Sequence, residues 1–101
     1  MQHVPEITIA EAQLRVAAGE VKVLDIRDEM SFEEAHIPGA ERLTNESVAT
    51  LLAETDRAQP LVVCCYHGHS SQSATMYLLD QGFTDVRSLR GGFEGWRQAA
   101  R

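Results

Sequence analysis

The strongest constraint on this chain is an unbroken apolar run, Leu61 to Cys65, that is followed at once by polar residues. A strand with one solvated face alternates apolar and polar residues, so an unbroken run indicates a strand buried on both faces, as in a parallel sheet. From Ser71 onward apolar residues recur at helical spacing, with Ala74, Tyr77 and Leu78 on the apolar side, until Gly82 marks a stop. The segment therefore predicts a strand, a short polar loop and a helix.

The same alternation continues on both sides of this segment. Thr8 and Glu11 have the spacing of a capping box, which predicts a helix that ends at Gly19. The apolar positions assigned to this helix are Ala10, Leu14 and Ala17 or Ala18. Further strands are expected at residues 21–26, 41–43 and 86–89.

Three more helical segments lie between or after these strands. Residues 28–35 are compatible with one or two turns, and Gly91-Gly92 opens a last helix that contains Phe93 and Trp96. Thr44 or Asn45 is expected to cap the helix between them, whose apolar side carries Val48, Leu51 and Leu52. Strands that alternate with helices in this way predict an α/β domain with a mostly parallel sheet.

Composition narrows the function classes. The 101 residues fit one domain, residues 1–101, and the net charge of −6 argues against nucleic acid and against anionic membranes as partners. The longest apolar run is far too short to span a membrane, and the N-terminus has no signal-peptide pattern. We therefore expect a cytoplasmic protein.

The two cysteines, Cys64 and Cys65, are sequence neighbours. Neighbouring cysteines cannot build a disulfide framework, because the usual Cα separation exceeds what one trans peptide allows. A strand also points successive side chains to opposite faces, so the two thiols have different surroundings. We interpret Cys64 as a packing residue inside the apolar run and Cys65 as the residue delivered to the end of the strand.

Sites in open α/β sheets lie at the carboxyl ends of strands, where Cys65 is predicted. A loop with Gly68 lets backbone N–H groups converge on one point, and the N-terminus of the next helix adds partial positive charge. Both effects favour a thiolate at Cys65, which predicts a nucleophilic cysteine whose pKa lies below that of a free thiol. Ser70 and Ser71 supply hydroxyls that close the loop.

Other cysteine chemistries fit the residues less well. A cysteine phosphatase uses an arginine after five further residues, and that position holds Ser71, which cannot replace a guanidinium on a phosphoryl group. A cysteine–histidine hydrolase needs a separately placed base, whereas His67 and His69 share the tight loop with Cys65. These three residues are also too few for zinc, which usually takes four ligands, so no metal is predicted. The two histidines are either polar surface or substrate contacts.

Four sequence blocks together resemble the rhodanese-like sulfurtransferases, and within them the single-domain GlpE-type thiosulfate sulfurtransferases. The blocks span nearly the whole chain in the family's order, and they are residues 23–27, 36–40, 65–71 and 91–96. The resemblance implies a rhodanese-like domain with about five strands and helices on both faces of the sheet. The loop from Cys65 to Ser70 also has the length of the sulfurtransferases, whereas the related phosphatase branch has a loop one residue longer that ends in arginine.

The resemblance implies a ping-pong transfer of sulfur from thiosulfate through a persulfide on Cys65, to cyanide, a thiol or a thioredoxin-like acceptor, with no cofactor. The substrate-binding residues it implies are those of the loop: Tyr66, His67, Gly68, His69, Ser70 and Ser71. Ser70 and Ser71 either contact thiosulfate oxygens or cap the helix. Many relatives have a cation where this chain has Tyr66, which predicts modest affinity for thiosulfate.

Two alternatives to a free-standing enzyme are a sulfur-relay carrier that serves a protein partner and a non-catalytic interaction module. The intact cysteine argues against the module, and we expect a monomer or a weak dimer. Asp25 and Arg27 match signature positions of the family, and we interpret them as structural residues that either pair with each other or tie loops together. The Gly91-Gly92 pair is interpreted as a tight turn, because the spacing of a phosphate-binding loop is absent. Phe93 and Trp96 are expected in the core.

Overall fold

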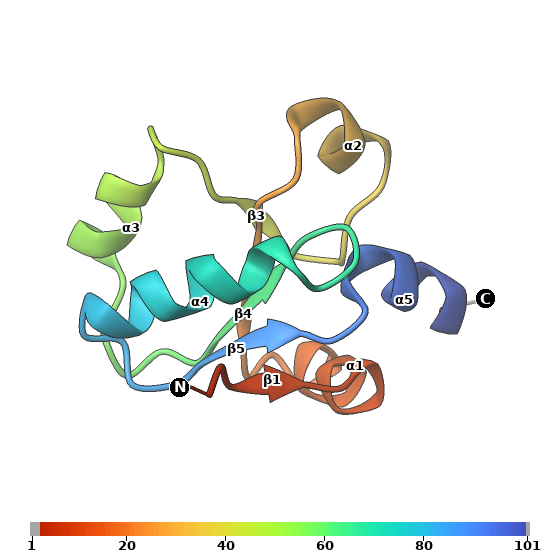
Figure 1. Cartoon of the computed structure of the whole chain (residues 1–101), viewed down its shortest axis with the longest axis horizontal. Coiled ribbons are helices and arrows are strands. Elements are labelled where there is room, and N and C mark those ends of the chain that lie inside the picture. Colours follow the sequence, from red (N-terminus) through yellow and green to blue (C-terminus); the bar gives the residue numbers. More distant parts are fainter. Residues whose placement is uncertain (1–2, 101) are drawn as a thin grey trace.

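A computed structural model describes residues 3–100 of the chain. Ten elements alternate along it (Figure 1). The strands are β1 (Glu6–Ile7), β2 (Lys22–Asp25), β3 (Glu41–Arg42), β4 (Leu61–Cys64) and β5 (Val86–Leu89). The helices are α1 (Ile9–Ala17), α2 (Glu29–Glu34), α3 (Val48–Glu54), α4 (Ser70–Asp80) and α5 (Gly92–Ala99).

The five strands form one sheet in the order β1-β5-β4-β2-β3, and every neighbouring pair is parallel. The expected parallel sheet is therefore confirmed. Strand β4 lies at the centre, and all four of its residues are buried, as the unbroken apolar run predicted. In the register, Cys64 of β4 lies opposite Asp25 of β2, and Val63 lies opposite Ser88 of β5. The carboxyl ends of β2, β4 and β5 consequently meet at one edge.

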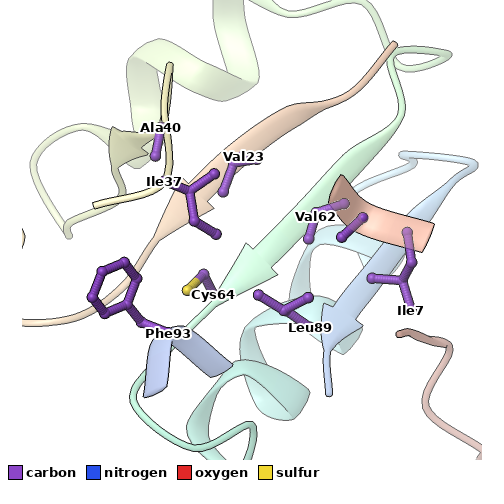
Figure 2. Packing of buried hydrophobic residues seen from close by; sticks show 9 residues of the cluster. Ile7, Val23, Ile37, Ala40, Val62, Cys64, Leu89 and Phe93 are labelled. Atoms are coloured by element: carbon purple, nitrogen blue, oxygen red, sulfur yellow. The ribbon is translucent and has the colours of Figure 1, made fainter. Parts of the chain in front are cut away.

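Helices cover both faces of the sheet, as expected, and each face has its own hydrophobic core. On one face, α1, α2 and α5 pack over alternate strand residues such as Val23, Val62 and Cys64, which Figure 2 shows beside Ile37 and Phe93. On the other face, α3 and α4 pack over the intervening strand residues, which include Leu24, Leu61, Val63 and Val86. The alternation along β4 thus sends Cys64 and its successor to different layers.

The apolar face assigned to the first helix from the sequence was wrong. Thr8 does cap α1, because its hydroxyl accepts a hydrogen bond from the Glu11 amide at 3.2 Å. However, Leu14 is 74% exposed, and the three alanines chosen with it face solvent too. Ala12 is buried, and Ile9 and Val16 pack beside it against the core. Ile9, Ala12 and Val16 have helical spacing too, so spacing alone does not choose between the two faces, and the position of the sheet and α5 relative to α1 does.

Smaller differences concern element ends. Strand β1, which has two residues, was not predicted. Helix α3 begins at Val48, later than a cap at Thr44 or Asn45 predicts, since Thr44 and Ser47 first form a turn closed by reciprocal side chain–backbone hydrogen bonds. Tyr77 was assigned to the apolar side of α4, but it is 44% exposed.

Candidate active site

Cys65 lies directly after β4 and begins the loop that leads into α4 (Figure 1). The loop wraps around its sulfur: the Gly68 amide donates to Cys65 Sγ at 3.1 Å, and the Ser71 amide, in the first turn of α4, donates to it at 3.3 Å. Ser71 Oγ lies 3.2 Å from the same sulfur. The side chain is 2% exposed, so these donors act in a site that excludes most water.

These contacts determine the acidity of the thiol. Burial raises the pKa of Cys65, but hydrogen bonds from the Ser71 hydroxyl and from the amides of Ser71, Gly68 and His67 lower it by more. The pKa of Cys65 is therefore held below its ordinary value. A sulfur surrounded by donors is stabilised as a thiolate, which is the nucleophilic form.

A second hydroxyl, that of Ser88, is hydrogen-bonded to Ser71 and was not predicted from the sequence. Ser88 of β5 is fully buried, and its Oγ lies 2.6 Å from Ser71 Oγ in a hydrogen bond. When Cys65 is a thiolate, Ser71 donates to the sulfur and Ser88 can donate to Ser71 in turn. The sequence signal that could have pointed to it is its place two residues after Val86, on the same face of the strand, because a buried hydroxyl needs a partner.

Cys64 has the opposite environment. Its side chain is 0% exposed and packs in the same core cluster as Phe93 of α5 (Figure 2). Burial raises the pKa of Cys64 to about 12, and the nearby Asp25 carboxylate adds to this effect. Cys64 is consequently a neutral packing thiol at physiological pH. The division of the two cysteines into a packing and a loop residue agrees with the interpretation of the sequence.

The N-terminus of α5 holds the cysteine loop in place. The Phe93 amide donates to the Cys65 carbonyl oxygen at 2.7 Å, and the Glu94 amide donates to the Tyr66 carbonyl oxygen at 3.1 Å. Because the carbonyl oxygens of Cys65 and Tyr66 are hydrogen-bonded to α5, the loop can direct backbone amides toward the sulfur. This close approach requires Gly92, because a Cβ there would lie 2.5 Å from the Tyr66 carbonyl. Gly91 and Gly92 both have positive φ, +84 and +60, which fits the tight turn expected from the sequence, whereas the close packing of Gly92 on Tyr66 was not predicted.

The remaining loop side chains do not gather at the sulfur in the same way. The phenol of Tyr66 contacts the Asp28 carboxylate at the start of α2. The Asp28 amide donates to the phenol oxygen of Tyr66 at 3.3 Å. His67, His69 and Ser70 are exposed. The assignment of the loop residues to substrate binding remains a prediction. The backbone amides of His67 and Gly68 lie at the sulfur, which supports the assignment for these two residues.

Asp25 and Arg27 form a buried ion pair, which was one of the two structural readings of the sequence. The shortest contact joins Arg27 Nη2 to Asp25 Oδ2 at 2.8 Å, and both residues are nearly inaccessible. Arg27 also donates to the Ala35 carbonyl oxygen at 2.8 Å and stacks over the ring of Phe93. The pair therefore ties the end of β2 to the segment after α2 and to α5, and its charge is already compensated.

Two further structural findings bear on the site. Among residues 3–100, no three His, Cys, Asp or Glu side chains come together in a group that could hold a metal ion. Within the same residues, no helix combines the length and the apolar character needed to cross a membrane.

The fold and the cysteine loop define a class of protein. The family model of the rhodanese-like domain matches residues 8–99, so the chain belongs to the rhodanese-like domain family. Solved structures with the same fold include the human single-domain sulfurtransferase TSTD1, at 20% identity and a TM-score of 0.83, covering 95% of this chain and 97% of that one. At this identity the similarity concerns the fold.

Two microbial structures are similar as well. A rhodanese-related protein from Thermoplasma volcanium has 20% identity and a TM-score of 0.80, covering 94% of this chain and 92% of that chain. A protein of unknown function from Rhodopseudomonas palustris, described as a possible tyrosine phosphatase, has 26% identity and a TM-score of 0.81, covering 96% of this chain and 82% of that chain. Proteins with this fold thus include one described as a sulfurtransferase and one described only as a possible tyrosine phosphatase.

Proposed function

We propose that this protein is a sulfurtransferase that accepts sulfane sulfur from thiosulfate on Cys65 and passes it to cyanide or a thiol. The observation that carries the proposal is the ring of donors around Cys65 Sγ, contributed by Gly68 and by both the amide and the hydroxyl of Ser71. Such donors stabilise an anionic sulfur before and after transfer, in the way that an oxyanion hole stabilises oxygen.

The chemical steps follow from this geometry. The Cys65 thiolate attacks the outer sulfur of thiosulfate, the bond between the two thiosulfate sulfurs breaks, and sulfite leaves with the electron pair. Cys65 then carries a persulfide whose negative charge the loop amides stabilise. Cyanide attacks the outer persulfide sulfur, thiocyanate forms, and the Cys65 thiolate is restored. No metal or cofactor enters either step.

Phosphoryl transfer is the less favoured chemistry for this loop. The position at which a cysteine phosphatase carries its arginine holds Ser71, which contacts the sulfur instead. Arg27 cannot take that role, because its guanidinium is bound to Asp25 and to a backbone carbonyl. A phosphoryl dianion would therefore lack a bidentate cationic partner in the loop.

Steady-state kinetics test the proposal. With thiosulfate and cyanide both varied, we expect thiocyanate formation with parallel double-reciprocal plots, and complete loss of activity in Cys65→Ser. Cys64→Ala is the matched control and should retain activity, because Cys64 lies in the core on the other face of the sheet. Thiocyanate formation by Cys65→Ser, or hydrolysis of p-nitrophenyl phosphate in place of sulfur transfer, would contradict the proposal. Slow cyanide turnover combined with fast uptake from a protein persulfide would indicate a relay carrier.

A further inference from the structure

An apolar groove of about 400 Å³ opens between α3 and α4. Its apolar lining consists of Ile26, Leu43, Val48, Ala74 and Tyr77. Thr44 and Asn45 complete it, and of the described residues that line it none is charged. Tyr77 is among the few large apolar side chains of the described chain that are strongly exposed, and α4 directs it to this groove.

One lining residue of the groove, Ile26, is the neighbour of Cys65 in the sheet. The β2–β4 register pairs Asp25 with Cys64, and the Ile26 amide donates to the Cys64 carbonyl oxygen at 2.9 Å, so Ile26 follows β2 at the level where Cys65 follows β4. Neighbouring strands are about 4.8 Å apart, which places these two residues side by side. Both belong to the layer of α4, since Ile26 packs against the core under α4 and Cys65 Sγ contacts Ser71.

Helix α4 gives a second connection between the groove and the thiol. Ala74 lies three residues after Ser71, so the two residues are neighbours on the helix surface. The lining of the groove on α4 thus starts at Ala74, about one turn after Ser71, and continues to Tyr77. A molecule that reacts at Cys65 and has an extended apolar part can place that part in the groove while its reacting atom stays at the loop.

The chemistry of the proposed substrates indicates which of them uses the groove. Thiosulfate and cyanide are small anions with no apolar part, and an uncharged groove offers them nothing. A thiol acceptor, in contrast, has a substituent of variable size. We propose that the groove binds the apolar substituent of the acceptor, which makes uncharged alkyl or aryl thiols the preferred acceptor class. This inference rests on the proposed function.

The transfer step balances without a further reactant. The acceptor thiolate attacks the outer sulfur of the Cys65 persulfide anion, the sulfur–sulfur bond to Cys65 breaks, and Cys65 leaves as a thiolate. The acceptor departs as a persulfide anion that carries the transferred sulfur. No external oxidant or reductant takes part.

Single-turnover discharge tests this inference. Protein loaded with thiosulfate and freed of excess donor is mixed with 2-phenylethanethiol, 2-mercaptoethanol or cyanide, and the loss of the added sulfur is followed by intact mass. We expect 2-phenylethanethiol to react faster than 2-mercaptoethanol by about tenfold, as burial of an apolar ring allows. Tyr77→Ser, which removes one wall, and Ala74→Leu, which fills the groove, should each remove most of this preference.

Leu14→Ser is the control, because it removes an exposed apolar side chain from α1, on the other face of the sheet. It should leave all three rates unchanged. Equal rates for the two thiols, or an aryl preference that survives both groove variants, would overturn the inference while cyanide discharge still supports the proposed function. Failure to form a persulfide, or to discharge it to cyanide, would overturn the proposed function and this inference together.

Discussion

At the scale of single residues, the chemistry depends on a short chain of hydroxyls that ends at the sulfur. A neutral Cys65 can donate its proton to Ser71 Oγ, whereas the thiolate accepts the Ser71 proton, and Ser88 can reorient to match either state. All three side chains are buried, so water does not replace a lost partner. The loop therefore tunes one thiol, while the neighbouring Cys64 has an environment that opposes its ionisation.

The first prediction concerns this tuning. Because the pKa of Cys65 is lowered, its thiolate persists as the pH falls below the ordinary thiol value of 9.0, and the rate of iodoacetamide alkylation should remain high there. Ser71→Ala removes a hydrogen bond to the charged form and should move the midpoint of the pH–rate profile upward by about one unit. Ser88→Ala should cause a smaller upward shift. Thr75→Val, which removes a buried hydroxyl bonded only to the Ser71 carbonyl, is the control. A wild-type midpoint at the free-thiol value would contradict the prediction.

At the scale of elements, three segments together build the site. Strand β4 delivers Cys65, the first turn of α4 supplies Ser71, and the N-terminus of α5 ties back the loop carbonyls. The loop fits under α5 only because Gly92 has φ +60 and no Cβ. The element that shapes the loop is thus the last one in the chain, although the sequence places the loop next to β4 and α4.

A substitution at this junction tests that dependence. Gly92→Ala forces a Cβ against the Tyr66 carbonyl at 2.5 Å in a left-handed backbone, and should lower the free energy of unfolding by about 3 kcal/mol or more. Gly19→Ala is matched, since Gly19 has φ +71 but open space around it, and should cost only about 1 kcal/mol. Urea unfolding measures both values. An equal decrease in the free energy of unfolding in the two variants would show that the close approach at Gly92 does not add to the cost of the substitution.

The element scale also shows what the sequence could and could not predict. The strand–loop–helix unit around Cys65 was predictable, because a doubly buried strand and a polar loop are encoded by adjacent residues. Ser88 was not, since its partner Ser71 lies 17 residues earlier in the chain and only the β4–β5 pairing brings them together. The same holds for α1, where Leu14 satisfies helical spacing but faces solvent, because packing against the sheet and α5 selects Ala12 and Val16 instead.

At the scale of the whole molecule, charge opposes the proposed donor. The chain has a net charge of −6, and thiosulfate is a dianion, so the overall field repels the substrate. Among the described cations near the loop, Arg27 is already paired with Asp25. Local amide dipoles must therefore supply the attraction. The acidic protein repels thiosulfate but does not repel an uncharged thiol acceptor that binds in the α3–α4 groove.

Ionic strength tests this view of the molecule. Salt screens the repulsion between the acidic protein and thiosulfate, so kcat/KM for thiosulfate should rise by about two- to threefold between about 20 and 200 mM salt. For an uncharged thiol acceptor the corresponding rate should stay nearly constant, which serves as the control. A fall of kcat/KM for thiosulfate with added salt would indicate that a cationic surface attracts the donor, contrary to the account given above.

The central claim is that Cys65 carries the transferred sulfur, and intact mass after incubation with thiosulfate tests it most directly. The wild-type protein and Cys64→Ala should each gain the mass of one sulfur atom, about 32 Da, and cyanide should remove it. Cys65→Ser should gain nothing under the same conditions. A sulfur adduct that persists in Cys65→Ser and disappears in Cys64→Ala would contradict the assignment of the site.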